Sequence, residues 1–551
     1  MTEENNFTYI EQPYYLVNFH TMMQWLEQRY GDLLLPQEQE FLALFMRLPV
    51  PAQCLLVRML MRTKLHFRLS KLNYPEVGDL STALAMLQQH QFITLNPMVD
   101  IRVVLEQLLK AELIRCFADD VGTGCDNKKA ICDRLTEIYA EQAQDWDKWT
   151  ADIDDTLIQL ECQAIFDALC LMFFGNPYQN LSEFVLTDLG LFVYEKIPFD
   201  DHTRAFQTRQ QVDFYLQLLI SRESLRQGLS EQALVELPAA TDAEWLNQKR
   251  NKTLYHIGYE FERSGQFDRA TYCYLDNSYS RARERYIRVL EKQQQYELAF
   301  DLCSQALAVP RDEQEKQGCE KLIKRLARKT DRKIAISANR TDIEQLVCQL
   351  PYDDHAVELI AADCLTEGDE LACYVENALF NSLFGMTFWD AVFKPCPGAF
   401  FHPFQSAPHD LYASDFASTR AAEIVEAWSR LEQPEYFLWL SERYRQKQGI
   451  ANPFVSWQVI NESLLSLVEK CIPIDHLKAI FKRLLFDMKN NRSGFPDLIV
   501  FDPQRCRYRL VEVKGPGDRL QDNQIRWFGY FSEHQIPASV MYIQWQDHAD
   551  N

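Results

Sequence analysis

The sequence contains no segment that could cross a membrane. A membrane-spanning helix needs roughly 18 or more consecutive apolar residues, and the apolar run at residues 168–174 is much shorter. The N-terminal stretch, MTEENNFTYI, lacks the basic residues and apolar core of a signal peptide. We therefore expect a soluble intracellular protein without a membrane partner.

Zinc-binding cysteine pairs are also absent. The chain has 15 cysteines in 551 residues, and no two of them are spaced as Cys-x-x-Cys. This excludes the common zinc-finger and zinc-ribbon patterns. Cysteines that are so widely spread, with no secretion signal, are typical of free, buried thiols.

The chain has no excess of positive charge: 57 Lys and Arg stand against 79 Asp and Glu, which gives a formal net charge of −22. Such a chain has little general affinity for nucleic acid, since binding to phosphates depends on Lys and Arg. A local basic patch can still bind DNA. The first candidate, the 58–71 patch, is an acid-free cluster of Arg58, Arg62, Lys64, Arg68 and Lys71.

A second candidate lies in the sequence KLIKRLARKTDRK. Its basic residues recur at three- and four-residue steps, which places them on one helix face. We name this face the 321–332 stripe; it comprises Lys321, Lys324, Arg325, Arg328 and Arg332. Lys324, Arg325 and Arg328 are its candidate DNA-binding residues, and an ordinary solvated helix face explains the pattern equally well.

Helical periodicity dominates the chain, whose length predicts roughly three or four domains. Residues 1–95 are predicted to form a helical DNA-binding region. Residues 96–150, with Leu105, Leu108, Leu113 and Lys128–Lys129, resemble the SAP DNA-binding module. Residues 151–350 resemble an irregular tetratricopeptide array, in which small residues such as Gly258 let helices approach closely. Such arrays offer concave surfaces to protein partners.

Residues 351–551 are predicted to form a mixed α/β domain. The stretch 371–393 has a helical apolar pattern, whereas strands are expected only near the C-terminus, at 498–501, 508–513 and 538–544. A helix over about 519–534 separates the last two strands. The predicted fold is therefore multidomain and mainly α, with a C-terminal α/β domain.

The first two of these strands form a predicted hairpin that gathers charge. Its register places Asp497 opposite Glu512, with Cβ atoms ~5 Å apart, and Lys514 on the same face. Two adjacent carboxylates repel unless a divalent cation such as Mg²⁺ lies between them. The carbonyl of Val513 could complete its coordination. The alternative is a surface hairpin with ordinary salt bridges.

A longer match supports the metal-binding interpretation. The segments SGFPDLIV and LVEVKGPGDRLQDNQ resemble the VRR-NUC nuclease domain of the PD-(D/E)xK superfamily. Residues 62–76, 171–190 and 382–393 are also similar to the Fanconi-associated nuclease family. The order of the regions matches a compact member of that family without its N-terminal zinc finger.

The resemblance implies a structure-selective DNA nuclease that acts as a 5′-flap endonuclease and 5′-3′ exonuclease in interstrand-crosslink repair. Its cofactor would be Mg²⁺ or Mn²⁺, and its partner branched or nicked DNA. Asp497, Glu512 and the Val513 carbonyl would bind metal, and Lys514 would be catalytic. The protein would lie in the cytoplasm with the nucleoid of a bacterium, or in a eukaryotic nucleus.

Two further residues follow from the same resemblance. Glu376 would supply another metal ligand from a helix, with Glu370 as its nearby competitor, and Gln524 would lie near the site. Gln524 is also explained as a solvated polar residue. Other interpretations are a different branched-DNA nuclease of the superfamily, such as a junction resolvase, or a helical DNA-binding scaffold with a silent nuclease fold.

Overall fold

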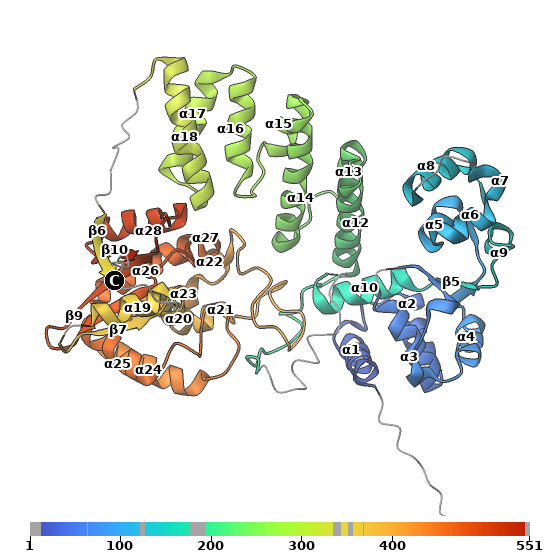
Figure 1. Ribbon diagram of the computed structural model, residues 1–551, viewed down its shortest axis with the longest axis horizontal. Coiled ribbons are helices and arrows are strands. Elements are labelled where there is room, and N and C mark those ends of the chain that lie inside the picture. The colour runs from blue at the N-terminus through green and yellow to red at the C-terminus, as the bar shows by residue number, and fades with distance from the viewer. Residues whose placement is uncertain are drawn as a thin grey trace, which may run out of the picture. The chain divides into compact units, whose positions relative to one another are not determined.

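The computed structural model describes residues 13–545 except 63, 122–126, 141, 177–192, 334–342, 351–355 and 367. The described elements fall into two compact units, Met1–Leu191 and Phe192–Asn551. Figure 1 shows that helices predominate in both, with the largest sheet in the second unit. This confirms the predicted mainly helical, multidomain architecture. No helix among the described residues is long and apolar enough to cross a membrane.

The first unit begins with a helical bundle. It is built from α1 (Tyr14–Tyr30), α2 (Pro36–Arg47), α3 (Val50–Leu60) and α4 (Leu80–Gln89). A three-stranded sheet, β1 (His66–Arg68), β5 (Leu157–Leu160) and β2 (Ile93–Leu95), adjoins it. The helix α10 (Gln163–Phe174) packs against α1 and α2. The strand β5 and α10, which we expected in the helical array after 150, therefore belong to this unit.

A smaller helical cluster lies between β2 and β5, at the segment that resembles the SAP module. The strands β3 (Met98–Asp100) and β4 (Ala143–Asp145) pair with each other. Between them lie α5 (Ile101–Gln107), α6 (Lys110–Cys116), α7 (Ala118–Val121) and α8 (Lys128–Tyr139), and α9 (Trp146–Trp149) follows β4. Leu105, Leu108 and Leu113 pack in its core with Trp146 and Trp149.

The second unit opens with a row of helices that stand side by side in chain order (Figure 1). They are α12 (Arg209–Arg226), α13 (Ser230–Glu236), α14 (Glu244–Arg263), α15 (Phe267–Tyr274), α16 (Ala282–Lys292), α17 (Tyr296–Ala308) and α18 (Glu313–Thr330). The predicted close approach occurs at Gly258, where a Cβ atom would lie 2.7 Å from Cβ of Cys273 in α15. Consecutive helices contact each other along the row.

The rest of this unit is built on a five-stranded sheet in the order β6-β10-β9-β8-β7. The strands β8 (Leu498–Asp502) and β9 (Arg507–Lys514) are antiparallel, and β10 (Ala538–Trp545) runs parallel to β9 and to β6 (Glu344–Leu350). The expectation of strands only near the C-terminus was wrong. β6 and β7 (Leu371–Tyr374) lie at the two edges of the sheet. β6 has no fully buried residue and β7 has only four residues, so their sequences lack a strong buried-strand pattern.

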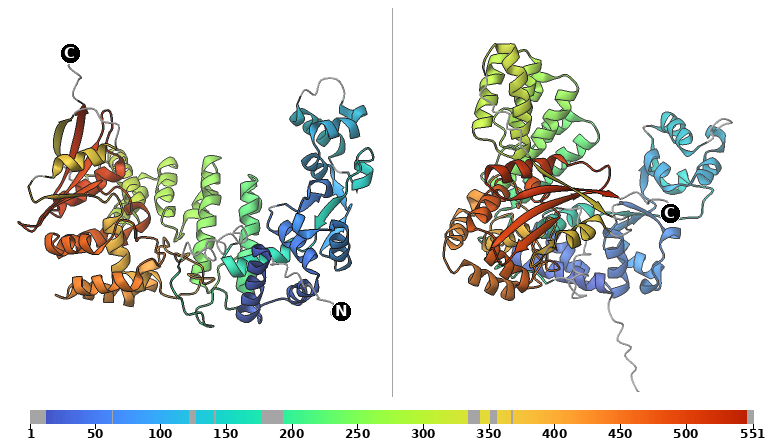
Figure 2. Two further views of the ribbon diagram at one scale, coloured as in Figure 1. Left: turned by 60° about the horizontal axis from the view of Figure 1, so that its bottom comes forward. Right: turned by 60° about the vertical axis from the view of Figure 1, so that its left-hand side comes forward.

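Helices cover both faces of this sheet (Figure 2). The helix α19 (Val357–Leu365) packs on the face that carries Val500, Val511 and Val513. The opposite face, with Ile499 and Leu510, packs against α26 (Ile474–Phe486) and α28 (Asp522–Glu533). Because side chains alternate along a strand, Glu512 and Lys514 share the α28 face with Leu510.

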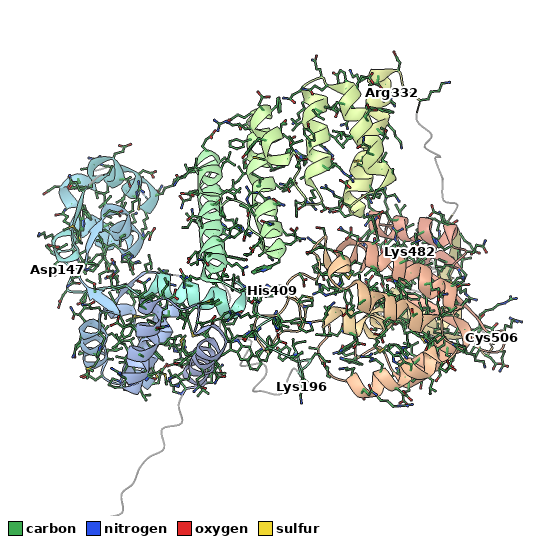
Figure 3. The ribbon with its side chains drawn as sticks, turned by 180° about the vertical axis from the view of Figure 1, so that it is seen from behind. Asp147, Lys196, Arg332, His409, Lys482 and Cys506 are labelled. Carbon is green, nitrogen blue, oxygen red and sulfur yellow. The ribbon has the colours of Figure 1, made fainter. Side chains whose placement is uncertain are left out.

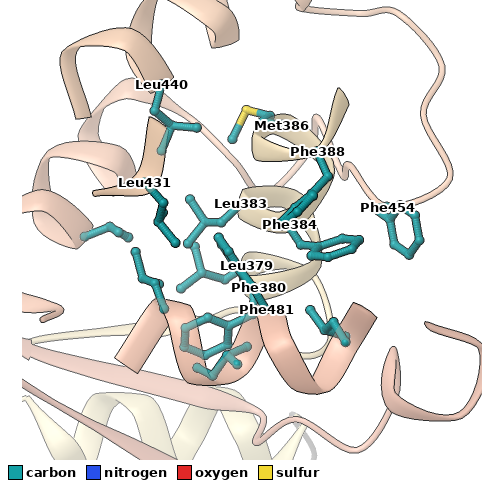
Figure 4. Packing of buried hydrophobic residues seen from close by; sticks show 14 of the residues in the cluster. Leu379, Phe380, Leu383, Phe384, Met386, Phe388, Leu431, Leu440, Phe454 and Phe481 are labelled. Atoms are coloured by element: carbon teal, nitrogen blue, oxygen red, sulfur yellow. The ribbon is translucent and has the colours of Figure 1, made fainter. Parts of the chain in front are cut away.

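A buried helix anchors this domain. Every residue of α20 (Leu379–Thr387) is buried, and the rings of Phe384 and Phe481 lie 5.8 Å apart (Figure 4). Further helices complete the layer: α21 (Trp389–Val392), α22 (Phe416–Thr419), α23 (Ala421–Leu431), α24 (Tyr436–Lys447), α25 (Glu462–Cys471) and α27 (Met488–Asn491). The core fixes the inner face of α26 and leaves its outer face open.

Candidate active site

The hairpin gathers its acidic residues as its register predicts. Ile499 pairs with Leu510 and Phe501 with Tyr508, so Asp497 lies directly before β8 and beside the end of β9. Its Oδ2 atom accepts a hydrogen bond of 2.9 Å from the backbone N–H of Val513. Asp497 is thereby held against the strand that carries Glu512.

Glu512 is the most buried charged residue of the site, at 1% exposed. Its Oε1 atom accepts hydrogen bonds from Lys514 Nζ at 2.6 Å and from Gln524 Nε2 at 2.5 Å. Gln524 is therefore part of the site rather than a solvated surface residue. The other carboxylate oxygen, Oε2, is buried and has no hydrogen-bond partner among the described residues.

Both carboxyl groups are hard to ionise in this environment. Burial raises the pKa of Asp497 to about 6, and the charges of Glu376 and Glu358 add to the rise, whereas Val513 N–H and Lys514 oppose it. Burial and the nearby Asp497 raise the pKa of Glu512 to about 7, despite the hydrogen bond from Lys514. Two buried carboxyls that repel each other form a site that a cation would stabilise.

Glu376 lies on the same side of the sheet end as these carboxyls. It is not on a helix, as we expected, but in the turn between β7 and α20. Its neighbour Val375 donates its N–H to the carbonyl of Asp497 at 2.9 Å. The Glu376 carboxylate is exposed and accepts a hydrogen bond of 2.5 Å from the Tyr374 hydroxyl.

Glu370 lies at the other end of β7. Its carboxylate is paired with Arg509 at 2.8 Å, and Arg509 is opposite Val500 in the β8–β9 ladder. The polarity of β7 therefore carries Glu376 toward Asp497 and Glu370 away from it.

The donor set fits a hard divalent cation. Carboxylate and backbone carbonyl oxygens are the ligands that Mg²⁺ and Mn²⁺ take, and the buried Oε2 atom of Glu512 has an unused lone pair that faces no protein donor in the described part of the chain. Asp497, Glu512 and Glu376 would hold such an ion. When bound, it would polarise a phosphodiester and lower the pKa of a water molecule. Within the described ranges, no group of three or more His, Cys, Asp or Glu side chains is arranged so that it could hold a metal ion as it stands.

The loop before Asp497 is held by hydrogen bonds from the β7–α20 turn and from α20. Asn377 accepts hydrogen bonds from the N–H groups of Gly494 and Phe495 at 2.8 and 3.1 Å, and Asn381 donates to the carbonyl of Arg492. Gly494 has φ +95°, and a Cβ atom there would lie 2.9 Å from the backbone of Asn523. Glycine at this position lets α28 approach the site.

The 58–71 patch is only partly available to a ligand. Arg68 is 5% exposed and bonds Glu112 at 2.6 Å and Asp155 at 2.7 Å. Its prediction as a DNA-binding residue is therefore wrong, since its charge is already neutralised inside the fold. Arg58 is paired with Glu76 at 2.8 Å. Arg62, Lys64 and Lys71 are exposed.

The 321–332 stripe is exposed, because Leu322, Ile323 and Leu326 occupy the inner face of α18. Its members differ in their pairing. Arg325 is bound to Glu291 at 2.6 Å and Arg332 to Glu297 at 2.8 Å, while Lys324 and Arg328 have no carboxylate partner within the described residues. Lys321 is likewise exposed and forms no ion pair within the described residues, so these three lysine and arginine side chains carry the charge that remains available on the stripe.

Sequence reasoning missed a basic cavity in the second unit. It has a volume of about 870 Å³. Its basic lining residues come from α14, α27 and the segments before α16 and α18, and they are Lys249, Lys252, Arg281, Arg311 and Lys489. None of them forms an ion pair within the described part of the chain. They are separated by up to 240 positions in the sequence, so no local pattern could reveal the cluster.

Six acids line the same cavity: Asp242, Glu244, Asp312, Asp410, Asp415 and Asp487. Three of them are engaged by groups of the fold. Asp410 is paired with Arg420 at 2.8 Å, Asp312 caps the N-terminus of α18 and Asp487 caps α27. Burial, followed by repulsion from Arg222 and Lys252, lowers the pKa of Lys249 to about 8. The lining is therefore mixed in charge, but its basic side chains form no ion pair within the described residues and are available to a phosphate group.

These features place the second unit among nucleases built on a mixed sheet with an acidic hairpin and a lysine two residues beyond its glutamate. Residues 434–545 match the VRR-NUC domain, and residues 13–94 match the family described as FAN1, HTH domain. Both matches agree with the fold and with the predicted nuclease activity.

The similarity extends over nearly the whole chain. A Fanconi-associated nuclease 1 homolog from Pseudomonas aeruginosa is 41% identical over 98% of this chain and 96% of its own length. The chain therefore belongs to the Fanconi-associated nuclease 1 family, as its sequence predicts, and it is a nuclease. A homolog from Arabidopsis thaliana is 24% identical over 93% of this chain and 65% of its own length.

A solved structure shows the same fold. The crystal structure of paFAN1 bound to 2nt 5′ flap DNA with gap is 40% identical, with a TM-score of 0.83 over 98% of this chain and all of that one. A second structure holds paFAN1 with 1nt 5′ flap DNA with gap, at a TM-score of 0.82.

Proposed function

We propose that this protein is a structure-selective, divalent-metal-dependent DNA nuclease that cuts 5′-flap and nicked DNA and degrades it from 5′ ends. The observation that carries the proposal is the buried Oε2 atom of Glu512, which has no hydrogen-bond partner in the described structure, beside Asp497 and Lys514. It supports a metal-bound phosphodiester at this hairpin, with Mg²⁺ or Mn²⁺ as the ion. The flap-bound relatives support the choice of substrate.

The distribution of charge supports a bent or interrupted substrate. The net charge of −22 disfavours broad contact with duplex DNA, so binding depends on separate patches: the 321–332 stripe, the basic cavity and the exposed part of the 58–71 patch. DNA that is interrupted by a nick or flap bends at lower energy than intact duplex. A role in interstrand-crosslink repair follows from such a substrate and from the family.

The test uses end-labelled 5′-flap, 3′-flap, nicked, four-way and intact duplex DNA with Mg²⁺, Mn²⁺ or EDTA. We expect cleavage of 5′-flap and nicked DNA that depends on metal, with cuts in the flap-bearing strand beyond the junction. Asp497→Ala serves as the inactive control. The proposal would be contradicted by equal rates on all substrates, by faster cutting of 3′ flaps, or by full activity in EDTA. Dominant cutting of four-way DNA would instead indicate a junction resolvase.

A further inference from the structure

A second hollow of about 680 Å³ lies on the outer face of α26. Its apolar lining comes from Trp428, Ala479, Leu485 and Phe486. Two lysines, a histidine and one acid also line it, which are Lys478, Lys482, His534 and Asp475. We call it the α26 groove. Figure 3 marks Lys482 from this groove and His409 from the basic cavity.

Three of the lining residues recur at intervals of one helical turn. Lys478, Lys482 and Phe486 are four residues apart, which places them on one face of α26. The inner face, with Leu477, Ile480 and Phe481, is buried in the core. The outer face therefore presents two cations and then an aromatic ring along roughly 12 Å of helix.

The groove and the basic cavity are continuous. Ala417, Leu485 and Phe486 line both hollows, so Phe486, with 41% of its surface exposed, stands where one opens into the other. Beyond it, Lys489 lines the cavity, and Arg492 begins the loop that leads to Asp497. The outer face of α26 thus adjoins the cavity that Lys489 lines.

The chemistry of the α26 groove suits single-stranded DNA. Such strands bind where aromatic rings stack on bases and cations follow the phosphates, without reading sequence. The ring of Phe486 has no aromatic or cationic partner among the described residues, and Lys482 has no carboxylate within ion-pair distance there. Lys478 is the weaker cation, because Asp475 and Glu432 lie 3.6 and 3.5 Å from it.

We infer that the α26 groove carries the outer nucleotides of a single-stranded flap, while the basic cavity holds the nucleotides next to the junction. The inference rests on the proposed function. The cavity volume of about 870 Å³ lies in the range that encloses one drug-sized ligand, roughly 300–1,000 Å³, so a longer strand has to leave it. The opening at Phe486 provides that exit.

The test compares flaps of different length. The substrates are a 5′ flap of one nucleotide and a flap of about 12 nucleotides, a length near the upper site size of single-strand-binding domains. We expect the double variant Lys478→Glu/Lys482→Glu to raise KM for the long flap roughly 10-fold and to leave KM for the short flap unchanged. Lys470→Glu, an exposed lysine of α25 outside the groove, is the matched control.

A second readout follows stacking directly. 2-Aminopurine placed within the long flap is quenched when it stacks, and binding is measured in EDTA so that no cleavage occurs. We expect quenching by the unaltered protein and its loss in Phe486→Leu, which keeps apolar volume but removes the ring.

The results separate the two proposals. The groove assignment would be overturned if the double variant left KM for the long flap unchanged, or if it raised KM equally for both flaps. An unchanged KM for the long flap would favour a peptide as the occupant of the groove. Failure of the unaltered protein to cut the short flap would instead contradict the proposed function.

Discussion

Lys514 donates a hydrogen bond of 2.6 Å to Oε1 of Glu512, and both side chains are almost completely buried. Oε2 of the same carboxylate has no donor among the described residues. A lysine placed in this way offsets part of the negative charge of the pair formed by Asp497 and Glu512, and it orients Glu512 so that the free oxygen is available to a metal ion.

The first prediction concerns the two hairpin carboxylates. Asp497→Ala and Glu512→Ala are expected to lower single-turnover cleavage of 5′-flap DNA by at least roughly 100-fold, the scale of losing an electrostatic group at a reacting centre. Binding of the same DNA, measured by fluorescence anisotropy in EDTA, should persist because the basic patches are separate. Near-normal cleavage by either variant would refute the assignment.

The second prediction separates Glu376 from Glu370. If Glu376 contributes to metal binding, Glu376→Gln should raise the Mn²⁺ concentration needed for half-maximal cleavage by about 10-fold or more, the scale of losing a group that supports a metal site. Glu370→Gln removes only a partly exposed pair with Arg509 and is the matched control. Equal effects of the two variants would contradict the assignment.

The third prediction is a pH dependence at Lys249. Its pKa is about 8 in the folded protein, below its ordinary value of 10.5. Between pH 8 and pH 10.5 the unfolded chain therefore binds more protons than the folded one. As a result, the contribution of Lys249 to the free energy of unfolding rises with pH over this range. Bound phosphate favours the ammonium form. DNA affinity should therefore fall as pH rises above 8, by at most about 10-fold per pH unit for one linked proton.

The measurement is anisotropy with 5′-flap DNA in EDTA between pH 7 and 9 at constant salt. Lys249→Gln should bind more weakly at pH 7 and lose this part of the pH dependence. Lys470→Gln, at an exposed position of α25 outside the basic patches, is the control for general loss of charge. An identical pH profile in Lys249→Gln and the unaltered protein would exclude the linkage.

The hairpin could be predicted from sequence because its pattern is local. Residues 498–513 contain two apolar runs and a turn, and that pattern determines the register that brings Asp497 to Glu512. Glu376 was harder to place, because its position depends on β7, an edge strand of four residues. The basic cavity could not be predicted, since Lys252 and Lys489 meet only through tertiary packing.

The fourth prediction concerns the 321–332 stripe. The single variants Lys324→Glu and Arg328→Glu should each weaken DNA binding. Each should also make the negative slope of log affinity against log salt less steep, by roughly one unit for each phosphate that is no longer bound. Arg325→Glu should do less, because Arg325 is already paired with Glu291. Salt titrations of the three variants check this order, and unchanged affinity and slope would show that the stripe is an ordinary solvated face.

The last prediction tests the structural role of Arg68. Its guanidinium is buried between Glu112 and Asp155, so Arg68→Ala leaves two carboxylates without their cation and should reduce the free energy of unfolding by about 3–5 kcal/mol. Lys71→Ala, at an exposed position of the same patch, should change it by less than about 0.5 kcal/mol. Urea unfolding of both variants measures the difference.

A DNA-binding role for Arg68 would give the opposite pattern, with weaker flap binding and unchanged stability. Acid adds an independent check. The bond with Arg68 holds the pKa of Glu112 at about 2, below its ordinary value of 4.5, so this contribution to stability is present above 4.5 and is lost as pH falls toward 2. Because Arg68→Ala removes the cause of that shift, the variant should lose less stability than the unaltered protein between pH 5 and pH 2.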